Sequence, residues 1–324
     1  MIGACDVRVS RRRGTSFRFS VRRNVTVVRG DSATGKTTLY EMIADHTRLG
    51  EASGVTVQCD RPCVALTDID WRNQLRSTSG SIVFVDEGLE EIRKPDFARA
   101  VRESDNYYVI FTRVELPSLP YSVDEVYRIK TSGKYHELVP MYRQGEGLRY
   151  SLSRRKQKGD FSALVTEDSK SGLQFFQRRL EGGGVRCETA RTNSAVVKWM
   201  LDHVDEDIFV IADGAAFGPY ADRVLKLQAE RPDSIAVCLP ESFEWLLLKS
   251  GVVSSPEIAA ILEDPGSSIE SADFFSWEQF FTSLLQDATK GSSLAYRKDK
   301  LAEGYMDAAN ADKVMALIAC RNVR

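Results

Sequence analysis

The sequence predicts an α/β protein built in two parts. Short apolar, β-branched runs alternate with segments of helical periodicity along most of the chain, which favours sheets covered by helices. The alternation stops in a glycine-rich and basic stretch, restarts, and gives way to a helical and aromatic tail. We expect a sheet domain at 1–143, a linker at 144–160, a smaller parallel α/β domain at 161–252 and a helical extension at 253–324.

Composition excludes several classes of protein. The 324 residues are 43% hydrophobic and 28% charged, which is ordinary for a globular chain of this size. Because 44 Lys and Arg stand against 46 Asp and Glu, DNA or RNA would have to be met by a local basic patch. No apolar run reaches the roughly eighteen residues of a membrane span, so no membrane partner and a cytoplasmic protein are expected.

The chain opens with an expected β-hairpin. Apolar and polar residues alternate in 7–10 and 17–21, on either side of a turn at Gly14. The polar positions are rich in arginine, and two interpretations stay open: contact with a phosphate backbone, or simple solvation. The arginines are Arg8, Arg11, Arg12, Arg13, Arg18, Arg22 and Arg23.

A phosphate-binding loop is predicted after the next strand, 25–29. The spacing G-x-x-x-x-G-K-T runs from Gly30 to Thr37, and a helical pattern follows. Glycines let main-chain amides approach phosphate oxygens, and the helix directs its positive dipole end at the same anion. The predicted binding residues are Gly30, Asp31, Ser32, Ala33, Thr34, Gly35, Lys36, Thr37 and Thr38.

Three side chains of this loop have expected roles. Lys36 would contact the β- and γ-phosphates, Thr37 would place its hydroxyl on Mg²⁺, and Thr38 would contact the α-phosphate.

Two carboxylates follow a strand expected at 82–85. All four residues of this run are apolar, which predicts burial on both faces of the sheet, and Asp86 and Glu87 stand where it ends. Beside a phosphate loop, Asp86 would assist Mg²⁺ coordination and Glu87 would orient the attacking water.

Further strands are expected around this pair. The strand 107–111 leads to Thr112 and Arg113, which could sense or stabilise transferred charge, or simply end the strand. Strands are also expected at 55–59, 63–66 and 126–129. Cys59 and Cys63 are either reduced thiols at a turn or half of a zinc site.

These motifs resemble the P-loop NTPases of the class that inserts an additional strand between the loop strand and the Asp-Glu strand. The resemblance covers Gly30–Thr38, Ile82–Glu87 and Tyr107–Arg113. It implies ATP with Mg²⁺ and a hydrolase, with ATP preferred over GTP on class frequency. The hairpin is similar to that of ABC-type ATPases, although no Leu-Ser-Gly-Gly signature lies between Thr38 and Asp86.

The second half carries acids at the ends of expected strands. Glu167 and Asp168 follow the strand 161–166, and Asp213 follows 208–212. Carboxyl ends of parallel strands meet at one edge, so these acids could bind a divalent cation. The alternative is that they cap the following helices.

This half resembles a Toprim domain, in which a strand-end glutamate and a later Asp-x-Asp bind Mg²⁺. Glu167 and Asp213 match, whereas Ala215 stands where the second aspartate is usual. The order of the two halves is similar to the OLD-type ATPase–Toprim proteins. It implies an ATPase that controls a nucleic-acid-acting effector, and Asp168 or Glu241 are candidates for the missing ligand.

Two other functions remain open. The second half could be a non-catalytic interaction module, which would make the protein a nucleotide-dependent switch, or the whole protein could phosphorylate a small metabolite. Homo-oligomerisation and a trans-acting arginine also stay open.

Overall fold

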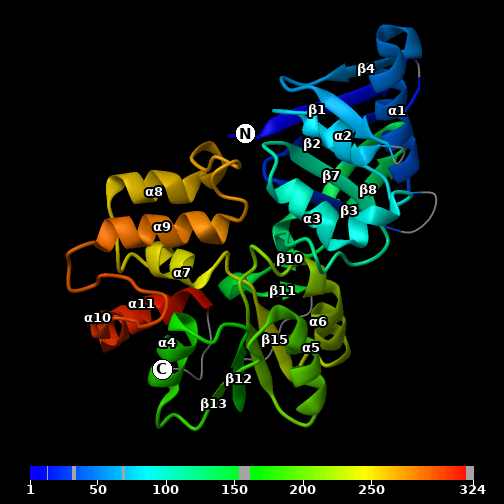
Figure 1. Ribbon diagram of the computed structural model, residues 1–324. Coiled ribbons are helices and arrows are strands. Elements are labelled where there is room, and N and C mark those ends of the chain that lie inside the picture. The colour runs from blue at the N-terminus through cyan, green and yellow to red at the C-terminus, as the bar shows by residue number, and fades with distance from the viewer. Residues whose placement is uncertain (13, 31–33, 68–69, 153–160, 319–324) are drawn as a thin grey trace. The chain divides into compact units, whose positions relative to one another are not determined.

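The computed structural model describes residues 1–12, 14–30, 34–67, 70–152 and 161–318, and of Glu146 only the backbone (Figure 1). It divides into two compact units. Unit 1 contains Met1–Met141 and Asp264–Ser276, and unit 2 contains Tyr142–Glu263 and Trp277–Arg324.

Within the described residues, unit 1 is built on one sheet of nine strands. The strand order is β4-β1-β2-β9-β8-β3-β7-β6-β5. The strands are β1 (Cys5–Arg11), β2 (Ser16–Val21), β3 (Val25–Arg29), β4 (Val55–Gln58), β5 (Cys63–Leu66), β6 (Ile82–Val85), β7 (Tyr107–Thr112), β8 (Val126–Ser132) and β9 (Tyr135–Pro140).

One side of this sheet is parallel and the other mainly antiparallel. Strands β5, β6, β7, β3 and β8 run parallel, whereas β1 pairs antiparallel with β2 and β4, and β8 with β9. The predicted hairpin is therefore present, and β7 lies between β3 and β6. Strand β9 was not predicted, and it joins the hairpin to the parallel strands by pairing with both β2 and β8.

The sheet curls around helix α1 (Lys36–Leu49). Strands β4 and β5 end the strand order, so a flat sheet would hold them eight strand spacings, about 38 Å, apart. Residues 59–62 alone join them, a link that reaches about 18 Å when extended. The curl places Leu39, Met42 and Ile43 of α1 in one core with apolar residues of β1, β2, β3, β5, β6 and β7.

Shorter helices complete the first 141 residues of unit 1. Helix α2 (Trp71–Arg76) packs on β5, and its Trp71 ring lies 5.6 Å from that of Phe97 in α3 (Pro95–Arg102). Single 3₁₀ turns are η1 (Gly50–Ser53), η2 (Glu90–Arg93) and η3 (Val123–Glu125).

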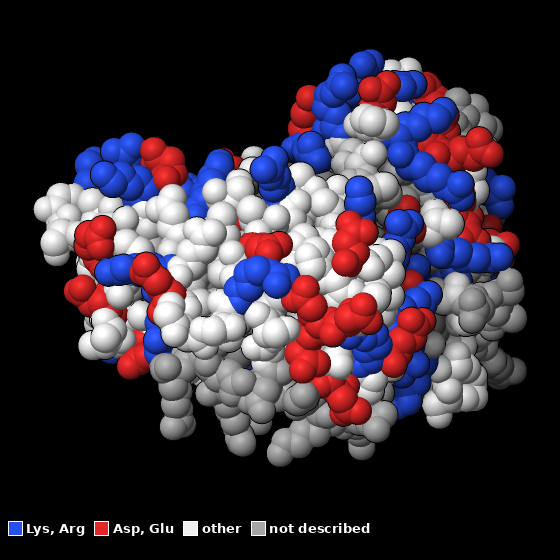
Figure 2. Space-filling view, turned by 90° about the horizontal axis from the view of Figure 1, so that it is seen from below, with Lys and Arg blue, Asp and Glu red and all other residues white. Residues whose placement is uncertain are grey.

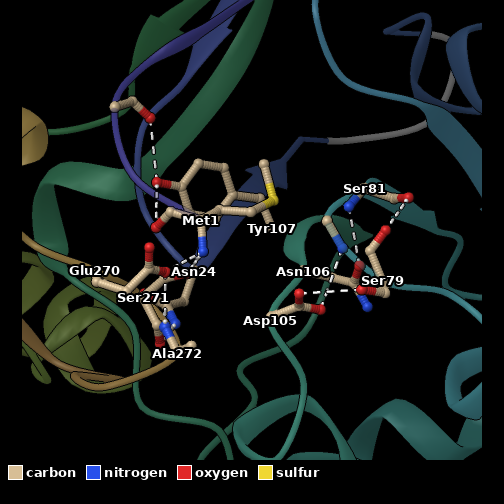
Figure 3. Close-up of polar contacts among 12 residues, drawn as sticks. Met1, Asn24, Ser79, Ser81, Asp105, Asn106, Tyr107, Glu270, Ser271 and Ala272 are labelled. Atoms are coloured by element: carbon tan, nitrogen blue, oxygen red, sulfur yellow. Dashed lines mark hydrogen bonds and ion pairs between the residues drawn. The ribbon is translucent and has the colours of Figure 1, made fainter.

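The segment 264–276, which contains η5 (Pro265–Ser267), belongs to unit 1 although it is far from it in sequence. The Met1 amino group donates to the Glu270 carboxylate and, at 2.7 Å, to the Ser271 hydroxyl (Figure 3). The Asn24 side chain donates to the Ser271 carbonyl at 3.0 Å. We expected one continuous extension at 253–324, and the structure instead assigns its parts to different units. Main-chain and amide contacts of this kind leave no periodic signal in a sequence.

Unit 2 is organised around a small parallel sheet. Its described strands follow the order β13 (Arg186–Thr189), β12 (Ala163–Thr166), β14 (Ile208–Ile211) and β15 (Ile235–Cys238). The central strands are buried throughout, as their apolar runs predicted. A short pair, β10 (Arg143–Gln144) and β11 (Tyr150–Ser151), with η4 (Glu146–Leu148) between them, precedes the sheet.

Helices cover both faces of this sheet. The step from β12 to β13 runs opposite to the steps from β13 to β14 and β15, so right-handed crossovers put α4 (Ser171–Leu180) on one face and α5 (Asn193–Asp202) and α6 (Gly218–Glu230) on the other. The remaining helices are α7 (Phe243–Lys249), α8 (Pro256–Glu263), α9 (Trp277–Thr289), α10 (Glu303–Met306) and α11 (Ala308–Ile318). None of the helices in the described ranges has both the length and the apolar content that crossing a bilayer requires.

Candidate functional sites

The first candidate site is the loop between β3 and α1. Gly30 and Gly35 have φ angles of +151° and +96°, in the region that favours glycine, and Gly35 immediately precedes α1. The exposed hydroxyl residues Thr37 and Thr38 lie in the first turn of the helix. Asp31, Ser32 and Ala33, which were predicted to bind phosphate, lie outside the described residues.

The lysine of this loop folds back on the loop itself. Lys36 is 5% exposed, and its ammonium donates to the Gly30 carbonyl and to the Thr34 hydroxyl, the latter at 3.5 Å. Both of these acceptors are uncharged oxygens. The loop thus combines a cation with the amino end of a helix, the two features that bind phosphate.

An aromatic pair packs beneath the loop. Phe17 of β2 and His136 of β9 are stacked with ring centroids 4.5 Å apart, and a Cβ atom at Gly35 would lie 3.7 Å from Phe17 and 3.8 Å from His136. His136 Nδ1 lies 2.9 Å from the Thr131 hydroxyl. The strand missed by sequence reasoning therefore helps to support the loop.

The register of the sheet brings the Asp86 and Glu87 pair to the same edge of the sheet as the loop. Arg29 is paired with Thr112, and Val85 with Ile110, so Asp86 and Glu87 emerge beside the end of β7. The Glu87 carboxylate accepts an ion-pair contact from Arg113 at 2.9 Å. This contact joins two residues that were predicted to act separately.

Asp86 and Thr112 have local partners. The Asp86 carboxylate accepts from the amide of Gly88 at 3.2 Å. The Thr112 hydroxyl is buried and exchanges two 3.1 Å hydrogen bonds with the main chain of Val114, which closes a turn after β7. That use of the hydroxyl favours the strand-end alternative for Thr112 over contact with phosphate.

No family model, curated protein or solved structure matches this chain. The case for a nucleotide with Mg²⁺ at this loop therefore depends on the chemistry of the residues that line it. Oxygen donors suited to Mg²⁺ are available from the hydroxyl of Thr37 and the carboxylate of Asp86. At Gly30 the φ angle of +151° favours glycine, and a Cβ there would lie in van der Waals contact with the Thr34 side chain, 3.4 Å from its hydroxyl.

The second candidate site is the carboxyl edge of the sheet in unit 2. Thr166 is paired with Ile211, and the amide of Glu167 donates to the Ile211 carbonyl at 3.2 Å, which sets Glu167 beside Asp213. Burial, with the charges of Glu278 and Asp168, raises the pKa of Glu167 to about 7. Burial and the Glu167 and Glu278 carboxylates likewise raise the pKa of Asp213 well above its ordinary range.

The ammonium of Lys298, from near the carboxyl-terminal end of the chain, compensates the negative charge at this edge. Lys298 donates to the Glu278 carboxylate at 2.6 Å and lies 3.8 Å from that of Glu244. Burial opposes the charged form of Lys298, but the Glu244 and Glu278 charges raise its pKa above the ordinary value. Lys298 also favours the ionised form of Asp213.

Main-chain contacts hold Lys298 in place. Its carbonyl accepts from the amide of Ser171 at 3.1 Å, and Gln174 binds the neighbouring main chain of Asp299 and Leu301 at 2.9 Å each. The Tyr296 hydroxyl donates to Glu244, which is 1% exposed, at 2.7 Å and lies 2.7 Å from the Ser171 hydroxyl.

Sequence reasoning missed Glu244, Glu278, Tyr296 and Lys298 altogether. The only local signal was the charged run 297–300, which is typical of a solvated turn.

Asp168 has a structural role at this edge. Its two carboxylate oxygens accept from the amides of Lys170 and Gly172, each at 2.8 Å, at the start of α4. A Cβ atom at residue 172 would lie 2.9 Å from the Asp168 carboxylate, so glycine permits this cap. The capping alternative therefore describes Asp168.

The acidic edge is not a preformed metal cage. In the part of the chain that the structure describes, no three His, Cys, Asp or Glu side chains are arranged to hold a metal ion. A cavity of about 10 Å³ lies against Glu167, Asp168 and Asp213, which is room for about one water molecule. Lys298 already supplies a positive charge here, so the fit of Mg²⁺ to this edge is poorer than at the phosphate loop.

The thiols Cys59 and Cys63 are free, as is Cys5 nearby at the start of β1. Burial and the Asp60 charge raise the pKa of Cys5 to about 11, and burial also raises the pKa of Cys59. Within the described ranges, these thiols belong to no group of three His, Cys, Asp or Glu side chains that could hold a metal ion.

Proposed function

We propose that unit 1 binds a nucleoside triphosphate, with ATP the expected one, and hydrolyses it in the presence of Mg²⁺. One observation carries the proposal: Lys36 opens a helix directly after a loop bounded by two left-handed glycines, and the second strand along from that loop ends in Asp86 and Glu87. The strand between them, β7, stands where the additional-strand P-loop class has one.

The proposed chemistry assigns each charged group a task. The Lys36 ammonium and the amides at the start of α1 bind the phosphates, while Thr37 and Asp86 hold Mg²⁺. When bound, Mg²⁺ neutralises the charge that develops on the phosphate oxygens. Glu87 orients the attacking water, and Arg113, its 2.9 Å partner, is released toward the phosphates.

Calorimetry with ATP and GTP, at millimolar Mg²⁺, tests the binding step. Lys36→Ala should weaken binding at least 100-fold, about 2.7 kcal/mol, because the charge at the phosphates is removed. Lys94→Ala, which removes an exposed lysine of the same unit paired with Glu91 at 3.0 Å, should bind as wild type does. Undetectable affinity of the wild-type protein for both nucleotides would refute the proposal.

Turnover tests the role of Glu87. Glu87→Gln keeps the size of the side chain and removes its charge, so binding should persist while phosphate release falls by about 10²–10⁴-fold. Equal turnover in wild type and variant would remove Glu87 from the mechanism.

For unit 2 we propose an effector role for the acidic edge, on or near nucleic acid, under control of the nucleotide. The support is the pair Glu167 and Asp213, two carboxyl groups at one sheet edge whose pKa values are both raised. Pairs of groups with perturbed pKa values are typical of functional sites. The alternative, an interaction module in a nucleotide-dependent switch, is favoured by Lys298, which compensates the acids without any metal.

Cleavage assays separate these two functions. DNA and RNA are incubated with Mg²⁺ or Mn²⁺, with and without ATP, using wild type, Glu167→Ala, Asp213→Ala and the exposed control Glu181→Ala. Cleavage that is lost in the first two variants and kept in the control supports the effector. An absence of cleavage by the wild type under every condition supports the switch.

A further inference from the structure

The outer face of the antiparallel part of unit 1 carries a row of cations across neighbouring strands. Arg8 of β1 is directly opposite Arg18 of β2, and the row continues through Glu137 of β9 to Lys130 of β8. All four side chains are exposed. The apolar partners on these strands, such as Val7, face the core. Four strands make the row about 14 Å long.

None of these cations forms an ion pair among the described residues, although Glu137 lies in register between Arg18 and Lys130. Among the described residues, the side chains of Arg8, Arg18 and Lys130 form no hydrogen bond or ion pair, and the same holds for the side chain of Arg128, two residues before Lys130 on the same face of β8. Like charges directly opposite each other on a sheet destabilise it. The chain is not basic as a whole, with 44 Lys and Arg against 46 Asp and Glu, and both signs are intermixed over the face in Figure 2. A repulsive arginine pair is therefore a specific feature of this sheet.

An exposed aromatic ring lies in the next row of the same face. Tyr135 is opposite Ser16 of β2 and Ser132 of β8, and 60% of it is exposed. The Lys134 ammonium lies 5.4 Å from the ring centroid. Unpaired cations suit phosphates, and an exposed ring beside them suits an unstacked base. A duplex would leave the ring without a partner, because its bases are already stacked.

We propose that this outer face, lined by Arg8, Arg18, Arg128, Lys130 and Tyr135, binds single-stranded nucleic acid. The cations contact phosphates of the strand and Tyr135 stacks on one base. Recognition of this kind is largely independent of sequence, because every base offers a flat face. The proposal goes beyond the nucleotide site and does not require it: Lys36→Ala should bind the strand as wild type does.

Fluorescence anisotropy with a labelled 20-nucleotide thymidine strand, without ATP, tests this. Tyr135→Ala should weaken binding about 5- to 100-fold and leave its salt dependence unchanged. The double variant Arg8→Ala, Arg18→Ala should lower the slope of log affinity against log salt by about 1.4, since each contact to a single strand contributes about 0.7. The control Arg72→Ala, Arg99→Ala removes two exposed arginines of unit 1 that pair with Asp96 and should change neither quantity.

Three results would overturn the proposal. The first is that the wild type does not bind the thymidine strand in 50 mM salt. The second is that the control variant loses as much affinity for the strand as the Arg8→Ala, Arg18→Ala variant does. The third is that a duplex binds at least as tightly as the strand, with an affinity that Tyr135→Ala does not change. Vesicles of anionic lipid are a further comparison. If the wild type binds these vesicles but not the strand, and the Arg8→Ala, Arg18→Ala variant loses vesicle binding, the face binds a membrane surface instead. Because Arg8, Arg18 and Tyr135 are exposed, Tyr135→Ala should melt close to wild type, and the Arg8→Ala, Arg18→Ala variant, which loses a like-charge pair, should melt no lower than wild type.

Discussion

The two candidate sites lie at the same place in their sheets but have opposite electrostatic designs. In unit 1 the strand ends at a glycine loop, and the Lys36 ammonium donates to the Gly30 carbonyl and the Thr34 hydroxyl of that loop. In unit 2 the strands end at carboxyl groups, and the Lys298 ammonium, 85 residues beyond Asp213 in the sequence, favours the ionised form of Asp213. Parallel strand ends therefore supply a location, while the chain that follows them decides which charge the site can accept.

A large loss of stability is expected when the buried Tyr296 hydroxyl of unit 2 is removed. Tyr296→Phe removes the hydroxyl that donates to the buried Glu244 carboxylate, which should cost about 2 kcal/mol of unfolding free energy. Tyr305→Phe, whose ring lies 6.2 Å from Tyr296 and whose hydroxyl donates to the Leu294 carbonyl, should cost about half as much. Urea unfolding measures both, and equal losses would mean that the charge on Glu244 does not matter.

A smaller effect is expected at the loop of unit 1. Gly35→Ala forces a Cβ into a left-handed conformation, which should cost about 1–2 kcal/mol and also weaken nucleotide binding. Gly54→Ala, directly after η1 with φ of +68° and ψ of +12°, carries a similar strain in open space. It should lose comparable stability without losing nucleotide affinity. Comparable affinity losses in the two variants would mean that the loop has no special role.

The third effect is a change in how the free energy of unfolding depends on pH. Since the pKa of Glu167 rises from 4.5 to about 7 on folding, native unit 2 keeps a proton that the unfolded chain releases. Stability from this group is complete below pH 4.5 and is lost as the pH rises toward 7. Glu167→Gln should flatten that slope in part, with Asp213 supplying the rest.

Urea unfolding between pH 4 and 8 measures the slope. Tryptophan fluorescence in a Trp71→Phe background reports unit 2 alone, because the other three tryptophans are Trp199, Trp245 and Trp277. An unchanged slope in Glu167→Gln would show that the carboxyl groups do not titrate as a pair.

The sequence predicted what depends on short-range pattern. Alternation placed the hairpin, and an all-apolar run placed β6 with Asp86 and Glu87 at its end. The loop glycines were predicted from their spacing, and both have the positive φ angles that only glycine adopts readily.

What the sequence did not predict depends on distant contacts. The role of Lys298 follows from hydrogen bonds to Ser171 and Gln174, which no window of adjacent residues contains. The partners of Thr112 and Asp168 were open for a related reason: a strand-end hydroxyl or carboxylate serves equally well as a ligand or as a cap until its neighbours are known. Strand β9 was missed because it ends in Pro140 and follows only a short turn at Gly133.

The assignment of 264–276 to unit 1 has a consequence for how the protein folds during synthesis. The chain passes between the units after Met141, after Glu263 and after Ser276, so dividing the gene at any single codon leaves at least one unit incomplete. During synthesis, the contacts of Met1 and Asn24 with Ser271 form only after the strands of unit 2 have left the ribosome. The amino-terminal unit is therefore the first to begin folding, but it must wait for most of its neighbour before it can finish.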